Sequence, residues 1–271
     1  MVSSAIGTVT RGTTNTNRLR RIDRWIAQLP VLRHTDDPLV VDLGFGASAV
    51  TTLELSHRLR SVRDDVEIIG LEIDTDRVQT ARGELGRVRA GLTGFDPHAP
   101  VSFEYGGFEL GRVERAPAVI RAFNVLRQYE EGAVATAWTH LRERLQPGGA
   151  LVEGTCDELG RVASWVTLDP SGPVTFTLSL RLSGLETTRI VAERLPKALI
   201  HHNVPGQPVH TFLSDLERLW QVHAPLGTYG VRQRWLAVAS GMRANGWPVR
   251  GGRTRWRLGE LSVDWNCVAP L

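Results

Sequence analysis

The sequence predicts an α/β protein with a doubly wound, mostly parallel sheet, an antiparallel edge hairpin and a helical C-terminal extension. Three observations predict this fold class. Short apolar runs alternate with helix-length segments up to Thr155. The first run ends in an acidic residue followed by a turn with two glycines. Beyond Thr155 the pattern changes to two segments of alternating apolar and polar residues, which is typical of a hairpin.

The parallel part of the predicted sheet has five strands, at 39–43, 66–72, 101–105, 118–123 and 150–155. The first is a continuous apolar run, as expected for a strand that is buried on both faces. Helices are predicted at 48–60, 75–90 and 130–145, the first of them capped by Ser48. The turn Leu145-Gln146-Pro147-Gly148-Gly149 ends the last of these helices and leads into the fifth strand.

Three regions are predicted along the chain. Residues 1–38 form a polar N-terminal arm and a covering helix at 18–29, and residues 39–185 form the sheet domain with its hairpin at 162–168 and 174–182. Residues 186–271 form a mainly helical extension packed on the same domain, with helices at 187–199, 209–223 and 232–245 and a closing strand at 255–265. Five of the eight tryptophans lie in this extension, which indicates a second small core.

Composition limits the functional classes. The 271 residues are 42% hydrophobic and 23% charged, as in folded globular proteins, and no apolar stretch approaches the ~20 residues of a membrane helix. Two distant cysteines and the lack of a signal-peptide pattern at residues 1–4 indicate a cytoplasmic protein. Lys197 is the only lysine, so a phosphate-binding loop with its Gly-Lys-Ser/Thr is excluded. The spacing of His, Cys and acidic residues predicts no metal site.

The turn after the first strand indicates a nucleoside-shaped ligand. Gly44 and Gly46 allow a tight turn and a close approach of the backbone to a ligand. Glu72 ends the second strand, and a carboxylate there can accept hydrogen bonds from both hydroxyls of a ribose. Because ligands of doubly wound sheets bind beyond the carboxyl ends of the strands, these residues predict one site.

These motifs resemble the cofactor-binding signature of class I, Rossmann-like methyltransferases, which use S-adenosyl-L-methionine (AdoMet). The resemblance covers residues 39–155 and includes the Pro147-Gly148-Gly149 turn before the fifth strand. It departs from the family where Ser48 replaces the third glycine, and where no helix separates the fifth strand from the next. The positions that it implies in cofactor binding are Asp42, Gly44, Phe45, Gly46, Glu72, Ile73, Gly107, Phe108, Arg121 and Ala122.

Two other functions stay open. In a Rossmann-fold NAD(P)-dependent oxidoreductase the ribose-binding acid lies about 20 residues beyond the glycine turn. Here Glu72 follows Gly44 by 28 positions (72 − 44), which favours the methyltransferase. A protein that binds AdoMet without catalysing a reaction is the second alternative.

The acceptor of the methyl group is not identified by any motif. A small molecule is favoured over RNA, because no basic stripe with interleaved aromatic residues is present. Cys156 follows Thr155 as in RNA 5-methylcytosine methyltransferases, but the Pro-Cys motif of those enzymes is absent, and an incidental buried cysteine is the better interpretation. The substrate-facing and catalytic candidates are Asn124, Arg127, Tyr129 and His201.

The polar arm before the first helix is a candidate lid. We predict that its residues Thr14, Asn15, Asn17 and Arg18 line the entrance for the substrate. A flexible leader is the alternative.

Overall fold

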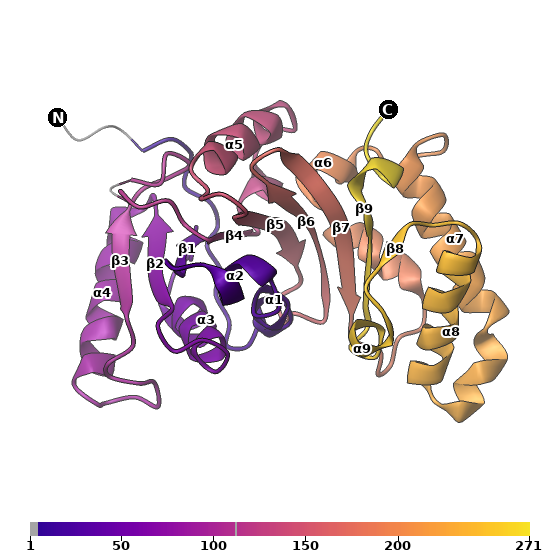
Figure 1. The fold of residues 1–271 in the computed structure, drawn as a ribbon, viewed down its shortest axis with the longest axis horizontal. Coiled ribbons are helices and arrows are strands. Elements are labelled where there is room, and N and C mark those ends of the chain that lie inside the picture. Colours follow the sequence, from indigo (N-terminus) through magenta and orange to yellow (C-terminus); the bar gives the residue numbers. More distant parts are fainter. Residues whose placement is uncertain (1–4, 112) are drawn as a thin grey trace. The chain divides into compact units, whose positions relative to one another are not determined.

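The computed structural model describes residues 5–111 and 113–271, which fall into two compact units (Figure 1). The first unit holds the chain up to Glu153 together with 158–160 and 168–172, and the second holds 154–157, 161–167 and 173–271. The first four residues of the predicted arm lie outside the described residues. The domain boundary predicted between residues 185 and 186 stays a prediction.

The first unit is built on parallel strands. β1 (Leu39–Leu43) lies between β2 (Glu67–Glu72) and β4 (Val119–Phe123), and β3 (Val101–Tyr105) pairs with the outer edge of β2. β5 (Ala150–Cys156) follows β4 in the order β3-β2-β1-β4-β5. The chain adds β2 and β3 on one side of β1 and then adds β4 and β5 on the other side. The carboxyl ends of β1 and β4 therefore flank the position at which doubly wound sheets bind their ligands.

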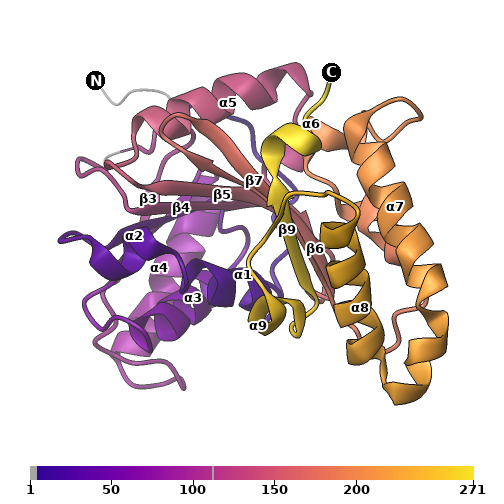
Figure 2. The ribbon, with the colours of Figure 1, turned by 45° about the vertical axis from the view of Figure 1, so that its right-hand side comes forward.

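Helices cover both faces of this sheet, as the alternating pattern predicts. α1 (Arg20–Ile26), α3 (Val50–Arg60) and α4 (Thr75–Arg89) lie on one face, and α5 (Gly132–Glu143) lies on the other (Figure 2). The short α2 (Pro30–His34) leads from α1 to β1, and the 3₁₀ turn η1 (Leu126–Gln128) follows β4. Every residue of β1 and β4 is buried, which explains why both strands are continuous apolar runs broken only by Asp42 and Arg121.

The second unit combines antiparallel strands with helices. β7 (Gly172–Leu180) pairs with β9 (Glu260–Asp264), which pairs with the short β8 (Val249–Arg250), while β6 (Val162–Asp169) precedes β7 in the chain. α7 (Pro208–Val222) and α8 (Val231–Ala244) are joined by η3 (Ala224–Tyr229) and lie side by side (Figure 2). The remaining elements are η2 (Thr188–Arg194), α6 (Lys197–Ile200), α9 (Arg253–Trp256) and η4 (Trp265–Cys267).

The structure confirms the predicted fold class and corrects two elements of the extension. The helix predicted at 187–199 is split into η2 and α6, because Pro196 holds Leu195 in an extended conformation (ψ 142°). The strand predicted at 255–265 begins only at Glu260. Before it, Gly259 turns the chain with φ +84°, and a β-carbon there would lie 2.0 Å from the carbonyl oxygen of Leu180.

The tryptophan-rich second core is present within the second unit. Trp220, Trp235 and Trp256 are buried there. The guanidinium of Arg234 lies 3.6 Å from the ring centroid of Trp220 and also donates to the carbonyl oxygen of that residue. The tryptophans therefore serve packing, as the pattern indicates. Among the residues that the structure describes, no helix has the length and apolar character needed to cross a membrane.

Candidate functional site

The glycine turn after β1 is tied to the end of β2. Gly44 and Gly46 have φ of +69° and +87°, a region that residues with a side chain rarely adopt. The amide of Gly44 donates to the carbonyl oxygen of Leu71 at 2.7 Å, and the amide of Gly46 donates to Oε2 of Glu72 at 3.0 Å. A β-carbon on Gly44 would lie 2.5 Å from a methyl carbon of Val125, beyond the end of β4. Glycine is therefore required here for both conformation and space.

Glu72 presents a buried carboxylate at the carboxyl end of β2, with only 2% of its surface exposed. Its Oε1 accepts from the amides of Ile73 and Asp74 at 2.9 and 3.4 Å. Nη1 of Arg77 lies 3.7 Å from its Oε2. Each carboxylate oxygen has about two lone pairs, so the two amides occupy Oε1, and Oε2, which accepts from Gly46, keeps one lone pair for a ligand.

Asp42 and Arg121 form a buried ion pair beneath the turn. Arg121 donates to Asp42 from Nε at 2.8 Å and from Nη2 at 2.6 Å, and Thr52 donates to Asp42 at 2.7 Å. Nη1 of Arg121 donates to Asp23 of α1 at 2.5 Å, and Arg58 of α3 donates to the other oxygen of Asp23 at 2.5 Å. Although burial alone would lower the pKa of Arg121, the carboxylates of Asp42 and Asp23 raise it above its usual value.

This network places Arg121 differently from the sequence interpretation. Arg121 was predicted among the cofactor-binding residues, but its side chain is fully buried and directed at Asp23 and Asp42. Ala122, in register with Leu43 of β1, is also fully buried. Through these contacts Arg121 joins Asp23 of α1 to Asp42 of β1 under the glycine turn, and a role of Asp42 or Arg121 in cofactor binding stays a prediction. Asp23 has no signal in the sequence that marks its role, because an acid on the buried face of a helix cannot be assigned a partner without the tertiary structure.

A small pocket of about 20 Å³ lies at the carboxyl ends of β1, β2 and β3. Six predicted residues line it together: Gly44, Glu72, Ile73, Gly107, Phe108 and Tyr129. Phe45 packs beside it with its ring 5.0 Å from that of Phe103. Leu43, Gly106 and Val125 complete the wall from the sheet side, and Ile6, Gly7, Thr8 and Thr10 of the arm complete it from the other.

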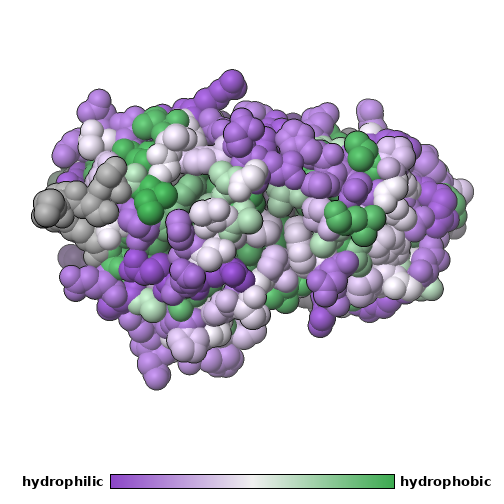
Figure 3. All heavy atoms as spheres, turned by 90° about the horizontal axis from the view of Figure 1, so that it is seen from above, coloured by the Kyte–Doolittle hydropathy of each residue, from purple (hydrophilic) through white to green (hydrophobic). Residues whose placement is uncertain are grey.

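The arm is held against this site by its backbone. The amide of Phe108 donates to the carbonyl oxygen of Ile6 at 2.9 Å, and the amide of Ala47 donates to that of Gly12 at 2.8 Å. The hydroxyl of Tyr129 accepts from the amide of Thr8 at 2.6 Å. On the face toward which the carboxyl ends of the strands point, hydrophilic and hydrophobic side chains are interspersed (Figure 3).

The predicted entrance residues lie farther along the arm. Thr14 contacts the glycine turn, since its hydroxyl donates to the carbonyl oxygen of Phe45 at 3.3 Å. Asn15 donates to the carbonyl oxygen of Glu158, and the amide of Asn17 donates to the carboxylate of Glu54 at 2.8 Å. Arg18 is buried and donates to the carbonyl oxygen of Thr13 at 2.7 Å. Their role at a substrate entrance stays a prediction.

The predicted catalytic candidates are divided between the two units. Asn124 follows β4 with φ +61° and Arg127 lies in η1, so both belong to the segment that leads to Tyr129. His201 belongs to the second unit, where it follows α6. The structure brings Tyr129 to the pocket, and the roles of Asn124, Arg127 and His201 stay predictions.

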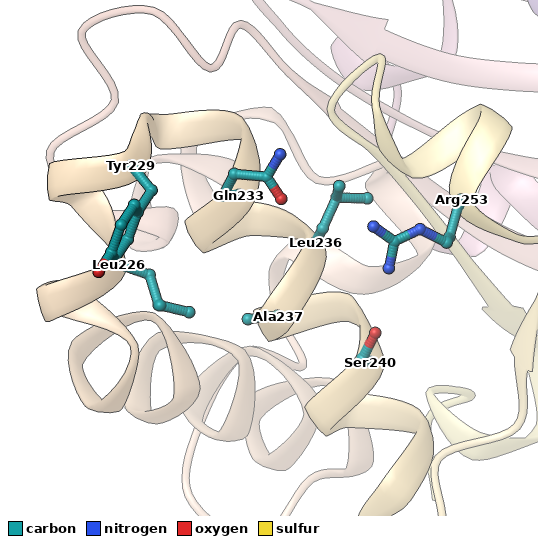
Figure 4. Close-up of a pocket in the computed structure, with 7 residues that line it drawn as sticks. All are labelled: Leu226, Tyr229, Gln233, Leu236, Ala237, Ser240 and Arg253. Carbon is teal, nitrogen blue, oxygen red and sulfur yellow. The ribbon is translucent and has the colours of Figure 1, made fainter.

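The second unit has an open groove of about 510 Å³ along α8 (Figure 4). Leu226 and Tyr229 of η3 border one end, Ser240 and Arg253 the other, and Gln233, Leu236 and Ala237 of α8 lie between them. The lining combines aliphatic, hydroxyl and amide groups with one cation.

Glu153 is a further buried carboxyl, in the middle of β5. Its side chain is fully buried. Burial raises the pKa of Glu153 to about 8, and the neighbouring Trp138 of α5 offsets only part of this effect. Glu153 is therefore mainly a neutral acid at neutral pH.

The sequence matches no protein-family model, and no curated protein is similar to it at a significant level. Solved structures resemble part of the chain. Human N-acetylserotonin methyltransferase with SAM is 20% identical over 53% of this chain, with a TM-score of 0.36. The glycopeptide N-methyltransferase MtfA with S-adenosyl-L-homocysteine is 14% identical over 55%, with a TM-score of 0.39.

Magnesium protoporphyrin IX methyltransferase from Synechocystis with bound SAH is 14% identical over 52% of this chain, with a TM-score of 0.38. The matched part covers 36%, 54% and 55% of these three proteins, so this chain spans about a third to just over half of their lengths. The strand order β3-β2-β1-β4-β5 is that of a doubly wound parallel sheet.

Proposed function

We propose that this protein is an AdoMet-dependent methyltransferase. The observation that carries the proposal is the buried Glu72 carboxylate, fixed by the amide of Gly46 at the carboxyl end of β2. The apolar side chains of Ile73 and Phe108 flank the same pocket. A carboxylate beside two apolar side chains matches the hydroxyl groups of a ribose beside a flat base.

These residues supply the contacts that an adenosine group needs. Oε2 of Glu72 would accept from a ribose hydroxyl, and Ile73 and Phe108 would flank the adenine. The amide of Phe108, which donates to the carbonyl oxygen of Ile6 in this structure, would donate to the adenine instead. AdoMet brings a methyl group that is already activated by its sulfonium. The protein therefore has to position the acceptor and exclude water, and it needs a general base only where the acceptor must lose a proton.

A small-molecule acceptor is favoured over RNA by the ion pairs of Arg58, Arg77 and Arg121 around the glycine turn. Arg77 lies beside Glu72 and Asp74, and Arg58 and Arg121 are held by Asp23 and by further carboxylates. Each of these cations already has an acidic partner within the fold. Binding RNA would need cations that are available to phosphates. Within the pocket, Tyr129 is the candidate for contact with the acceptor, and Asn124 and Arg127 precede it in the chain.

Calorimetric titration with S-adenosyl-L-homocysteine tests the cofactor. We expect micromolar binding by the unaltered protein and at least about tenfold weaker binding by Glu72→Gln, because an amide accepts hydrogen bonds less strongly than a carboxylate. Glu67→Gln is the matched control, since Glu67 begins the same strand at its opposite end and pairs with Arg115 on the surface. NADH is titrated in parallel. Preference for NADH, or equal binding by Glu72→Gln, would overturn the proposal.

Transfer of a labelled methyl group from AdoMet tests catalysis. The protein is incubated in parallel with a small-metabolite extract and with total RNA, with Glu72→Gln as the inactive control. Label in the metabolite fraction supports the preferred acceptor class. Label in RNA alone would overturn that preference, and cofactor binding without transfer to either fraction would support a binding protein without catalytic activity.

A further inference from the structure

The backbone of the arm occupies the position at which the proposed function places adenosine. Gly7 lies between the side chains of Ile73, Phe108 and Tyr129. A β-carbon built on it would be 2.9 Å from the Tyr129 hydroxyl and 3.4 and 3.7 Å from Ile73 and Phe108. Ile73 and Phe108 are the two apolar residues that would flank an adenine.

The arm also uses the polar groups of the site. The carbonyl oxygen of Ile6 accepts from the amide of Phe108 at 2.9 Å, as a ring nitrogen of a purine would. The amide of Ile6 donates to Glu109 at 2.6 Å, so the arm satisfies a donor and an acceptor at this end of the pocket. Its peptide groups therefore supply the hydrogen-bonding pattern of a heterocycle.

A second set of contacts holds the arm beside Glu72. Nη2 of Arg77 donates to the carbonyl oxygen of Thr10 at 2.7 Å, while Nη1 of the same guanidinium lies 3.7 Å from Glu72. The carbonyl oxygen of Gly12 accepts from Ala47 in the glycine turn. Gly12 has φ +63°, and a β-carbon there would lie 2.3 Å from Arg77. Arg77 thus holds the arm beside Glu72, the proposed ribose-binding acid.

The space that remains is too small for a second occupant. The pocket measures about 20 Å³, whereas sites for small molecules and cofactors have volumes of ~300 Å³ and more. Adenosine and the arm cannot both occupy this position.

We propose that residues 6–12 are a built-in competitor for the cofactor site. In the closed state the arm fills the adenosine position, and in the open state it leaves and the cofactor binds. This inference rests on the proposed function and adds a regulatory step to it. The apparent affinity for the cofactor is then the intrinsic affinity multiplied by the fraction of molecules that are open.

A lid that closes over bound cofactor makes the opposite prediction, so hydrogen exchange distinguishes the two. The amides of Ile6, Thr8 and Arg11 donate to Glu109, Tyr129 and Gln128 in the closed state. We expect saturating S-adenosyl-L-homocysteine to speed exchange in a peptide that spans residues 5–14 of the full-length protein. Slower exchange in that peptide would show a lid and would overturn the competitor while leaving the proposed function intact.

A full-length variant that cannot seat the arm gives the second test. Gly12→Val places a side chain against Arg77 in a backbone conformation that valine avoids, outside the hydrophobic core. We expect it to bind S-adenosyl-L-homocysteine at least about tenfold more tightly than the unaltered protein. Its melting temperature should fall by only about 3–5 °C, because the seated arm no longer stabilises the folded state. Gly91→Val is the matched control, because Gly91 lies outside the arm, has a similar φ of +72° and has no atom within 4 Å of its β-carbon position; the affinity of this variant should not change.

Unchanged or weaker binding by Gly12→Val would overturn the competitor. Failure of both the unaltered protein and Gly12→Val to bind the ligand would overturn the proposed cofactor, and the role of the arm with it. Binding by Gly12→Val that is lost in Gly12→Val combined with Glu72→Gln would support both proposals and place the ligand at Glu72.

Discussion

The amide of Gly46 donates to the carboxylate of Glu72 at 3.0 Å, so the turn after β1 and the acid that ends β2 are positioned by each other. A change in the turn should therefore displace the acid even when Glu72 itself is unaltered. This coupling makes the glycines of the turn suitable positions at which to test the site without removing its charged group.

Gly44→Ala should destabilise the protein by about 2–4 kcal/mol. About 1–2 kcal/mol reflects the left-handed backbone, and the rest reflects contact of the new methyl group with Val125 at 2.5 Å. Gly91→Ala is the matched control, because Gly91 has a similar φ of +72° and no atom lies within 4 Å of the β-carbon position. Urea unfolding of both variants measures the difference. Equal losses of stability in the two variants would show that the side chain of Val125 moves away from the added methyl group at no cost.

Arg121→Met should destabilise the protein by about 3–5 kcal/mol, because it leaves the buried carboxylates of Asp23 and Asp42 with fewer partners. Replacing Arg82, whose pair with Glu104 is exposed, should cost only about 0–1 kcal/mol. Denaturant unfolding of both variants provides the comparison. Adding Asp23→Asn and Asp42→Asn to Arg121→Met should recover part of the loss, and a further loss instead would contradict the ion-pair account.

Glu153→Gln should change how stability depends on pH. The pKa of Glu153 is raised to about 8 by burial, so the folded state binds a proton more tightly than the unfolded state does. This contribution to stability is fully present below the pKa of the unfolded state, near 4.5, and is lost as the pH rises toward 8. The variant should therefore gain stability relative to the unaltered protein from pH 5 to pH 8. If the free energies of unfolding of the two proteins changed in parallel with pH, Glu153 would have the same pKa in the folded and unfolded states.

Glu217→Gln should have the opposite dependence on pH. Burial would raise the pKa of Glu217, but hydrogen bonds from Gln221, Thr188 and Thr187 lower it below its usual value. The stabilisation is present above the pKa of the unfolded state and is lost as the pH falls through the folded value. The variant should therefore be less stable at pH 7, with a difference that shrinks below pH 4. Thermal melts of both proteins across this pH range measure the difference in melting temperature. A difference that did not change with pH would show that the ionised form of Glu217 contributes nothing to stability.

The local pattern of the sequence was sufficient to predict the parallel strands, the glycine turn and the position of Glu72. These features depend on residues close together in the chain, where burial and turn geometry dictate composition. Six of the predicted cofactor and substrate residues line one pocket, although they come from four separate segments. Pro196 was also enough to exclude a single helix at 187–199, because the residue before a proline disfavours the helical conformation.

The sequence predicted a lid-like arm, but the contacts of residues 6–12 with the pocket could not be predicted, for a physical reason. Its contacts run through backbone groups, such as the carbonyl oxygens of Ile6, Thr10 and Gly12, which every residue type possesses. Neither hydrophobic periodicity nor side-chain chemistry reports such contacts. Arg77 was missed for a related reason. In the sequence, an arginine in the first turn of α4 is indistinguishable from a residue on the solvent-exposed face of the helix. Only the fold brings it to Glu72 and Thr10.

The ion pairs of Asp23 anchor the root of the arm. Arg121 and Arg58 hold α1 to the sheet and to α3, and Arg58 also donates to Asn17, where the backbone turns with φ +61°. Any movement of the arm is thereby confined to the short stretch before Asn17. A segment on so short a tether stays near its binding site at an effective concentration in the millimolar range. Whether the cofactor displaces the arm would then depend on the cellular cofactor concentration divided by its Kd, compared with that local concentration divided by the Kd of the arm.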